Sequence, residues 1–325
     1  LLEHAHHGVP RLGEGYTTDD NARALLYLSL LPEGARDEGL VRTYLAFLLH
    51  MQKEDGRFRN GLTLDGRFED EGEAEDPTGR AVLALAAAQR LPPPYAGPAR
   101  EALLRALPAL EGFTSLRGRA YALLGLLALP KEPFLEAAEA LGEGLLRAFR
   151  EAEPAWPYPG PLTYANHRPV EALYAYGLAF RRQEAVALAR RALAFLKEHY
   201  FTPGEEGLFF DPVGNRFMAR GRDKPLFDQQ PIEAKCALLA HLRFGERVLA
   251  EVAFLWFHGR NRLRAPLVDA FGPMDGLTPH GPNQNRGAEA LLAYLLAWQA
   301  LVQGVFPQVD EGVALGRVFA LGGRP

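Results

Sequence analysis

The sequence contains one cysteine, Cys236, and this scarcity excludes two classes of protein. A single thiol cannot form an internal disulfide framework, and it cannot build a zinc site of several cysteines. Because Cys236 lies in an apolar helical stretch, it fits a reducing compartment, and we expect a cytoplasmic protein. Leu, Ala, Arg and Glu are abundant between short Pro-rich turns, a composition typical of helical thermophile proteins.

Excess basic charge and long apolar runs are also lacking. The formal net charge is −4, lysine is scarce beside arginine, and basic residues are mixed with acidic ones. We therefore expect no nucleic-acid partner. No apolar run has the length needed to cross a bilayer, so we expect no membrane partner either.

Sequence motifs that bind cofactors or activate a serine are absent. The chain has no G-x-S-x-G, no P-loop and no G-x-G-x-x-G after a strand. Three histidines stand close together in "EHAHH" (3–7), but H-x-H-H is not the spacing of helical metal ligands. No second His/Cys cluster follows, and we expect neither a cofactor nor a metal ion.

Six segments share one pattern, a polar start followed by a nearly uninterrupted apolar run. They begin at Asp19, Asp76, Leu116, His167, Gln229 and Asn285. A helix that is apolar nearly all round must be buried on every side, whereas the amphipathic segments between them (37–52, 98–110, 133–149, 183–200 and 245–257) have one wet face. Alternating buried and half-buried helices predict an all-α fold, an (α/α)6 toroid of six helical hairpins.

A superhelical solenoid of helix pairs is the alternative, but solenoid repeats usually keep a fixed period and these segments do not. We expect one toroid domain over residues 1–325, with 302–325 as a tail of uncertain structure.

Longer non-helical stretches precede three of the expected inner helices. Residues 55–68 and 207–221 contain Gly turns between short β-like runs and predict hairpins, and 258–285 is a connection without periodicity. Inner helices of a toroid run parallel, so their N-termini share one face. These insertions are therefore expected to wall a funnel on the active-site face.

One charged residue recurs at the same position in all six buried segments. It is Arg23, Arg80 and Arg119 in the first three and Glu171, Glu233 and Glu289 in the last three. Since an isolated buried ion costs several kcal/mol, we expect these residues to pair with one another in a layer beneath the funnel. A catalytic role for Glu233 is the alternative.

Polar side chains exceed what helix capping needs at the starts of these segments. Thr18 or Asp19 suffices to cap the first helix and Asp76 the second, which leaves Asp20 and Glu75 over. Similar surpluses occur in "FDQQP" (227–231) and "HGPNQN" (280–285). Amides and carboxylates bind adjacent sugar hydroxyls, and aromatic rings support the sugar face, so the surplus predicts a carbohydrate site.

Glycoside cleavage needs one protonated and one ionised carboxyl group. Adjacent acids repel, which raises the pKa of one of them. The catalytic candidates are therefore Asp19, Asp20, Glu75 and Asp76. The substrate-binding candidates are Tyr16, Trp156, Tyr164, Asn166, His167, Asp228, Gln229, Gln230, Glu233, Asp275, Asn283 and Asn285.

Five blocks of the sequence resemble a bacterial and archaeal family of six-hairpin, glycosidase-like toroids. They are "GYTTDDNARALL", "DGRFRNGLTLDGRFEDEGEAEDPTGRAVLAL", "LTYANHRPVEAL", "FDQQPIEA" and "DGLTPHGPNQNRGAEALLAYL", which span residues 4–298. The resemblance implies a toroid often fused to or encoded beside glycosyltransferases, and hence a possible glycosyltransferase partner.

The consecutive aspartates Asp19 and Asp20 also resemble those of endo-α-mannanases of the same superfold, where one Asp is nucleophile and its neighbour acid/base. The aromatic residues that usually follow the two aspartates are replaced here by Ala22 and Arg23. In the fourth block, "LTYANHRPVEAL", an acidic residue is expected at position 165, where this chain has Ala165.

Two other functions remain open from the sequence. One is a non-catalytic carbohydrate-binding or scaffold partner of a glycosyltransferase. The other is a sugar epimerase or isomerase, which would need a pair of histidines facing the funnel; His167 and His280 are the rim candidates. The favoured function is a glycoside hydrolase acting on an oligosaccharide or glycoconjugate.

Overall fold

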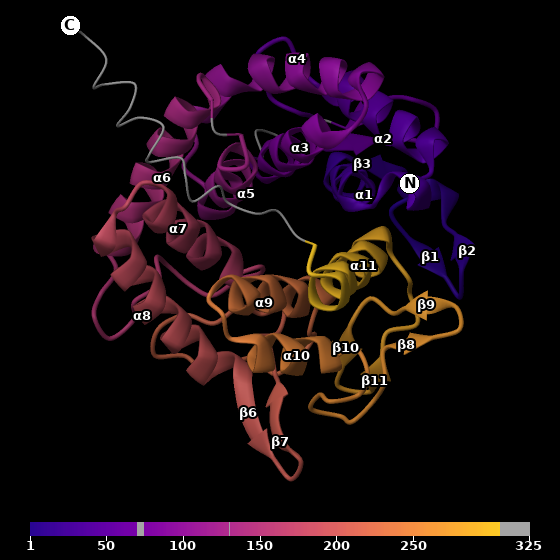
Figure 1. Ribbon diagram of the computed structural model, residues 1–325. Helices are drawn as coiled ribbons and strands as arrows, with labels where there is room; N and C mark the ends of the chain where they lie inside the picture. The colour runs from indigo at the N-terminus through magenta and orange to yellow at the C-terminus, as the bar shows by residue number, and fades with distance from the viewer. Residues whose placement is uncertain (70–74, 130, 306–325) are drawn as a thin grey trace, which may run out of the picture.

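The computed structural model describes residues 1–69, 75–129 and 131–305, and its helices form two concentric rings (Figure 1). The inner helices are α1 (Thr18–Leu30), α3 (Glu75–Ala87), α5 (Leu116–Leu126), α7 (His167–Ala179), α9 (Pro231–Arg243) and α11 (Ala288–Gln303). The outer helices are α2 (Glu38–Met51), α4 (Pro93–Leu110), α6 (Phe134–Arg150), α8 (Gln183–Tyr200) and α10 (Arg247–Leu255).

The inner ring closes on itself. Each inner helix packs against the next one, and α11 contacts both α9 and α1. The helices α2, α4, α6, α8 and α10 pack on α1, α3, α5, α7 and α9, respectively. The predicted (α/α)6 toroid is confirmed. Among the described residues, no helix combines the length and apolarity needed to cross a bilayer.

The sixth hairpin differs from the other five. Within the described ranges, no outer helix covers α11, and the side chains of Leu291 and Val302 on its outward face are 39% and 60% exposed. The tail expected at 302–325 stays a prediction, and residues 302 and 303 belong to α11. Residues 306–325 lie outside the described residues.

Short strands form the insertions between helices. Their bounds are β1 (Ala5–His6), β2 (Val9–Pro10), β3 (Tyr16–Thr17), β4 (Gly61–Leu62), β5 (Phe68–Glu69), β6 (Phe201–Gly204), β7 (Gly207–Phe210), β8 (Val268–Asp269), β9 (Gly272–Pro273), β10 (Leu277–Thr278) and β11 (Gly281–Pro282). All pair antiparallel, and β4 lies between β3 and β5. The connection at 258–285, expected to be irregular, therefore carries two hairpins.

Two boundaries differ from the prediction. The hairpin expected at 207–221 instead pairs β7 with the preceding β6, so it occupies 201–210. The helix expected at 98–110 starts earlier, at Pro93. Proline at the first helical position removes an N–H that has no partner in any case, so α4 can begin inside the Pro-rich stretch.

Candidate functional site

A polar cavity of about 450 Å³ opens at the starts of α1, α9 and α11. This volume is typical of small-molecule sites. The structure brings eight of the predicted site residues to this cavity, here called the funnel: Asp19, Asp20, Asp228, Gln229, Gln230, Asp275, Asn283 and Asn285. The funnel is thus shared by the starts of three inner helices, whereas a mouth common to all six was expected.

The first turn of α1 contributes two carboxyl groups to the funnel. Thr17, rather than Thr18 or Asp19, is the N-cap, and its hydroxyl oxygen accepts a hydrogen bond from the N–H of Asp20. Both aspartates therefore fall inside the helix, and neither carboxylate is used as the cap. Both are available for other contacts.

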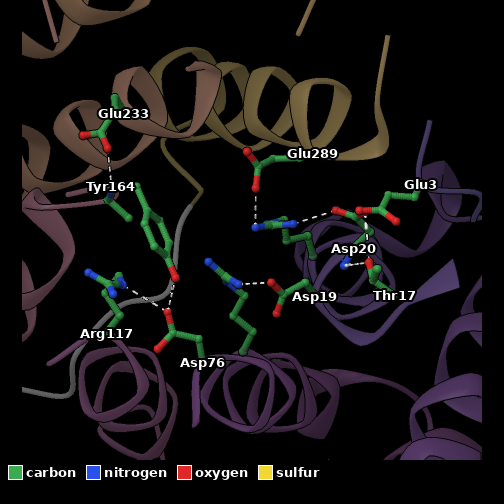
Figure 2. Close-up of polar contacts among 12 residues, drawn as sticks. Glu3, Thr17, Asp19, Asp20, Asp76, Arg117, Tyr164, Glu233 and Glu289 are labelled. Atoms are coloured by element: carbon green, nitrogen blue, oxygen red, sulfur yellow. Dashed lines mark hydrogen bonds and ion pairs between the residues drawn. The ribbon is translucent and has the colours of Figure 1, made fainter. Parts of the chain in front are cut away.

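Asp20 and Glu289 flank one guanidinium group, that of Arg23 (Figure 2). Arg23 Nη1 donates to Asp20 Oδ1 at 2.6 Å, and Arg23 Nη2 donates to Glu289 Oε2 at 2.7 Å. Two hydrogen bonds and one guanidinium separate the nearest carboxylate oxygens, which are thus within about 8 Å of each other. This upper limit admits the carboxyl separations of both retaining and inverting glycosidases.

The two neighbouring aspartates have different environments. Asp20 is 3% exposed, and burial raises the pKa of its carboxyl, opposed by the charge of Arg23. Asp19 is less buried and pairs with Arg80, while its Oδ1 atom has no partner among the described residues. Both carboxyl groups therefore pair with an arginine, but Asp20 is the more deeply buried of the two and its pKa is raised.

The N-terminal segment and the loop before α11 also contribute to the wall of the funnel. Asn285 Nδ2 donates to Asp275 and to His4 Nδ1, the latter at 3.0 Å. Asp275 also accepts from the N–H of Gly287, just before α11 begins. The Oδ1 atom of Asn285 is buried without a described partner and remains an acceptor at the funnel.

The two glutamine side chains just before α9, Gln229 and Gln230, have different roles. Gln229 is fully buried; its Nε2 donates to Asp211 Oδ1 at 2.8 Å, and its Oε1 accepts from Trp256 Nε1 at 2.9 Å. Its side chain is therefore structural. Gln230 is the N-cap of α9 but makes no side-chain cap hydrogen bond, and the carboxyl of Asp228 is exposed. Gln230 and Asp228 are the free polar groups on this side.

Glu75 and Asp76 do not line the funnel. Glu75 accepts from the N–H groups of Thr114 and Ser115, directly before α5, and thereby serves the start of that helix. Asp76 accepts from Ser115 Oγ at 2.7 Å, Arg117 Nε at 3.0 Å and Tyr164 Oη at 2.5 Å. Burial alone would raise the pKa of Asp76, but Arg80 and these donors hold it below its usual value.

Four further candidates lie outside the funnel because they are used in packing. Tyr16 packs on Phe47, and Trp156 packs on Phe195 at a surface hollow elsewhere. Tyr164 lies under Arg117, whose Cζ atom is 4.0 Å from the ring centroid. Asn166 is buried and donates to Tyr200 Oη. No Phe, Tyr or Trp of the described residues lines the funnel, so the structure does not bring the expected aromatic platform to it.

His167 is fully buried against His241 and Tyr200, and neither of its ring nitrogens has a described partner. Burial lowers its pKa well below the usual histidine value. His280 is exposed in the β10–β11 turn and does not line the funnel. The expected pair of histidines facing the funnel is therefore not found among the described residues. One described histidine, His4, lines the funnel.

The expected ion-pair layer forms only at Arg23 and Glu289. Arg119 instead donates to the carbonyls of Phe113 and Gly144, and Glu171 pairs with Arg168 and Arg243. Glu233 is 1% exposed and accepts from the N–H of Ala165 at 2.5 Å. Burial raises the pKa of Glu233 to about 8, and its side chain does not reach the funnel.

The funnel contains residues that the candidate list missed: Glu3, His4, Asn60, Asn215, Thr278 and Glu289. Glu289 had a usable signal, since it recurs in register at the start of a buried segment. Asn60, Asn215 and Thr278 lie in the segments between helices, where no local pattern marks them. Glu3 and His4 belong to the "EHAHH" segment, which the sequence did not connect with the site. In the described part of the chain, no group of three or more His, Cys, Asp or Glu is arranged to hold a metal ion.

The chain is similar in structure to several sugar-acting enzymes. A D-mannose isomerase superposes with a TM-score of 0.67 at 11% identity, covering 93% of this chain and 91% of that one. A cellobiose 2-epimerase from Spirochaeta thermophila gives 0.62 at 15% identity, covering 94% and 88%. A GH76 α-mannanase from Bacteroides thetaiotaomicron gives 0.59 at 11% identity, covering 94% and 88%.

At these identities the likeness shows the fold alone. No protein-family model matches the chain, and no curated protein matches it in sequence. The class defined here is thus the (α/α)6 toroid with a polar, carboxylate-rich funnel.

Proposed function

We propose that this protein is a glycoside-processing enzyme, a hydrolase that cleaves an oligosaccharide or glycoconjugate in the funnel. The observation that carries the proposal is the pair Asp19 and Asp20, which lie side by side in one cavity with different partners. Glycoside hydrolysis needs this division between a protonated and an ionised carboxyl.

Asp20 is the proposed general acid. Burial raises its pKa, so its carboxyl holds a proton at a higher pH than an exposed aspartate would. It would donate that proton to the oxygen of the leaving sugar. Asp19 is the proposed base or nucleophile, because it lines the same cavity and its pairing with Arg80 leaves Oδ1 without a described partner.

Glu289 is an alternative partner for Asp20. It lies on the other side of Arg23, and its side chain is 38% exposed, so one carboxylate oxygen can face a water molecule or a sugar. The amides Gln230, Asn283 and Asn285 would bind hydroxyl groups around the reacting sugar.

The test uses Asp20→Asn, with Glu171→Gln as the matched control. Glu171 is a buried carboxylate with arginine partners outside the funnel. We expect Asp20→Asn to lose about 10²–10⁴ in kcat on aryl glycosides and manno- or gluco-oligosaccharides. Sugar binding, measured by calorimetry, is retained. Glu171→Gln is expected to lower stability while kcat is kept.

The two competing functions give different results. A carbohydrate-binding partner would bind sugars without any turnover in the wild-type protein. An epimerase or isomerase would exchange a sugar C–H proton with solvent and leave the glycosidic bond intact, which NMR in D₂O detects. Either result would remove the hydrolase proposal.

A further inference from the structure

A second, smaller cavity lies inside the ring of inner helices, and the proposed reaction does not use it. Every inner helix contributes to its lining, which places it on the axis of the toroid; one residue of each is Arg23, Arg80, Tyr121, Arg168, Lys235 and Leu296. Its volume is about 30 Å³. Arg23 lines both this axial cavity and the funnel.

The axial cavity is unusually cationic for an interior site. Arg23, Arg80, Arg168 and Lys235 are each 5% exposed or less. The three arginines have carboxylate partners, namely Asp20 and Glu289 for Arg23, Asp19 for Arg80 and Glu171 for Arg168. Within the described residues, Lys235 has no hydrogen-bond acceptor and no carboxylate partner.

An unpaired ammonium group is costly at such a place. Moving a charge out of water costs several kcal/mol unless an opposite charge or hydrogen bonds compensate it. Burial, together with Arg168, Arg23 and Arg80, lowers the pKa of Lys235 to about 8, while Cys236 acts in the opposite direction. The amine therefore still carries its charge at neutral pH, and the ammonium ion is uncompensated by any described group.

Tyr121 adds a hydrogen-bond donor without a described partner to the residues that line the axial cavity. The hydroxyl of Tyr121 is buried and unpartnered in the described structure, and its ring lies between two guanidinium groups. The Cζ atoms of Arg80 and Arg168 are 4.7 and 5.5 Å from the ring centroid. The rest of the lining is mainly leucine, which offers no acceptor.

We propose that the axial cavity binds one small monovalent anion of the halide class, with Lys235 as its principal counter-ion. A water molecule needs about 10–15 Å³ of such space, so 30 Å³ holds a single ion of chloride or bromide size. The anion compensates the charge of Lys235.

Bromide is the direct probe, because its anomalous scattering locates it in a crystal. Crystals of the whole chain, soaked in sodium bromide, are expected to show one anomalous peak among Lys235, Arg168 and Tyr121. Absence of a peak at molar bromide, with only water density in the cavity, would overturn the proposal.

A solution experiment tests the role of Lys235. Melting of the wild-type protein is compared in sodium chloride, sodium bromide and sodium gluconate of equal ionic strength. Because a ligand that binds only the folded state stabilises it, the halides are expected to raise Tm by a few degrees over gluconate. Lys235→Met should lose this halide-specific increment, whereas the control Lys197→Met, at an exposed helix position, should keep it.

The increment is measured within each variant, so a change in the absolute Tm of Lys235→Met does not affect the comparison. An equal increment in Lys235→Met and the wild type would contradict the proposal. Should Lys235→Met fail to fold, the bromide peak in wild-type crystals still decides. Neither readout depends on glycosidase activity.

Discussion

Glu233 illustrates how burial sets the charge of a single residue in this protein. Its Oε1 atom accepts from the N–H of Ala165, but Oε2 is buried without a described partner, and no arginine pairs with it. Burial raises its pKa from about 4.5 to about 8. At neutral pH the folded protein therefore holds a proton here that the unfolded chain has released.

This proton predicts a pH dependence of stability. Below about pH 4.5 the group is protonated in both states. Between about pH 4.5 and 8 only the unfolded chain ionises, so stability falls as pH rises, on the order of 1 kcal/mol per pH unit. Glu233→Gln keeps a neutral group at every pH, and we expect its free energy of unfolding to fall less steeply over this range.

Urea denaturation of both proteins at pH 5, 6, 7 and 8 measures the difference. Glu75→Gln is the control, because Glu75 accepts N–H donors at the start of α5. Parallel pH curves for the wild type and Glu233→Gln would contradict the expectation.

Sequence reasoning found Asp19, Asp20 and Glu233 as residues in need of an explanation, but it did not find their partners. Asp20 pairs with an arginine three positions later, which spacing alone allows. The pairing of Asp19 with Arg80 joins α1 to α3 and depends on the distance between two helices. Such partners follow from packing, which a single sequence does not record.

At the scale of elements, α3 and α5 approach each other at backbone distance. A Cβ atom added at Gly79 would lie 2.5 Å from the carbonyl oxygen of Gly118, and one at Gly125 would lie 2.8 Å from the Cα of Leu83. Each of these glycines lowers the stability of its helix by about 1 kcal/mol relative to alanine. Their presence in two buried helices is explained by the close contact.

Glycine-to-alanine substitutions should therefore change the free energy of unfolding in opposite directions at glycines packed against another helix and at glycines with open space around them. Gly79→Ala forces two backbones apart, and we expect a loss of about 1–3 kcal/mol of stability. Gly97 lies in α4 with no atom within 4 Å of an added Cβ, so Gly97→Ala should stabilise by up to about 1 kcal/mol. Urea melts of the two variants test the pair, and stabilisation by Gly79→Ala would show that α3 and α5 are not in contact.

The periodicity of apolar residues predicted which segments form helices, but it predicted the ends of the helices less well. The inner helices start within a few residues of the predicted positions because each has a polar or proline start signal. The early start of α4 and the pairing of β7 with β6 were missed. In both cases the local residues allow more than one structure, and tertiary contacts decide between them.

At the scale of the whole molecule, ring closure brings distant segments to one mouth. The N–H of Ala288 donates a hydrogen bond to the carbonyl oxygen of Glu3, and the N–H of Arg286 donates to the carbonyl oxygen of Ala5. These bonds hold the N-terminal segment against the start of α11. This contact puts Glu3 and His4 into the funnel wall. The sequence predicted a mouth common to all six inner helices, and the funnel joins the starts of three of them. The residues added by ring closure depend on contacts between distant segments, which the sequence does not record.

Ring closure also fixes the sign of the field in the funnel. Six acidic residues line the funnel: Glu3, Asp19, Asp20, Asp228, Asp275 and Glu289. Among the described lining residues, the arginines and lysines are represented by Arg23 alone, and Arg23 already pairs with Asp20 and Glu289. A cavity with such an excess of acids attracts cationic ligands and repels anionic ones. If the funnel is a sugar site, its substrates are expected to be neutral or amino sugars, not uronic acids.

This selectivity is measurable with oligosaccharides that differ only in one substituent. We expect kcat/KM to be at least about tenfold lower for a uronic-acid substrate than for its neutral counterpart, a difference near 1.4 kcal/mol. Because salt screens charges over about 10 Å at 0.1 M and about 3 Å at 1 M, the gap should narrow as sodium chloride is raised across this range. An amino-sugar substrate should show the opposite salt dependence. Faster turnover of the uronic acid would mean that the carboxyl groups of the funnel are neutralised or turned away from the substrate.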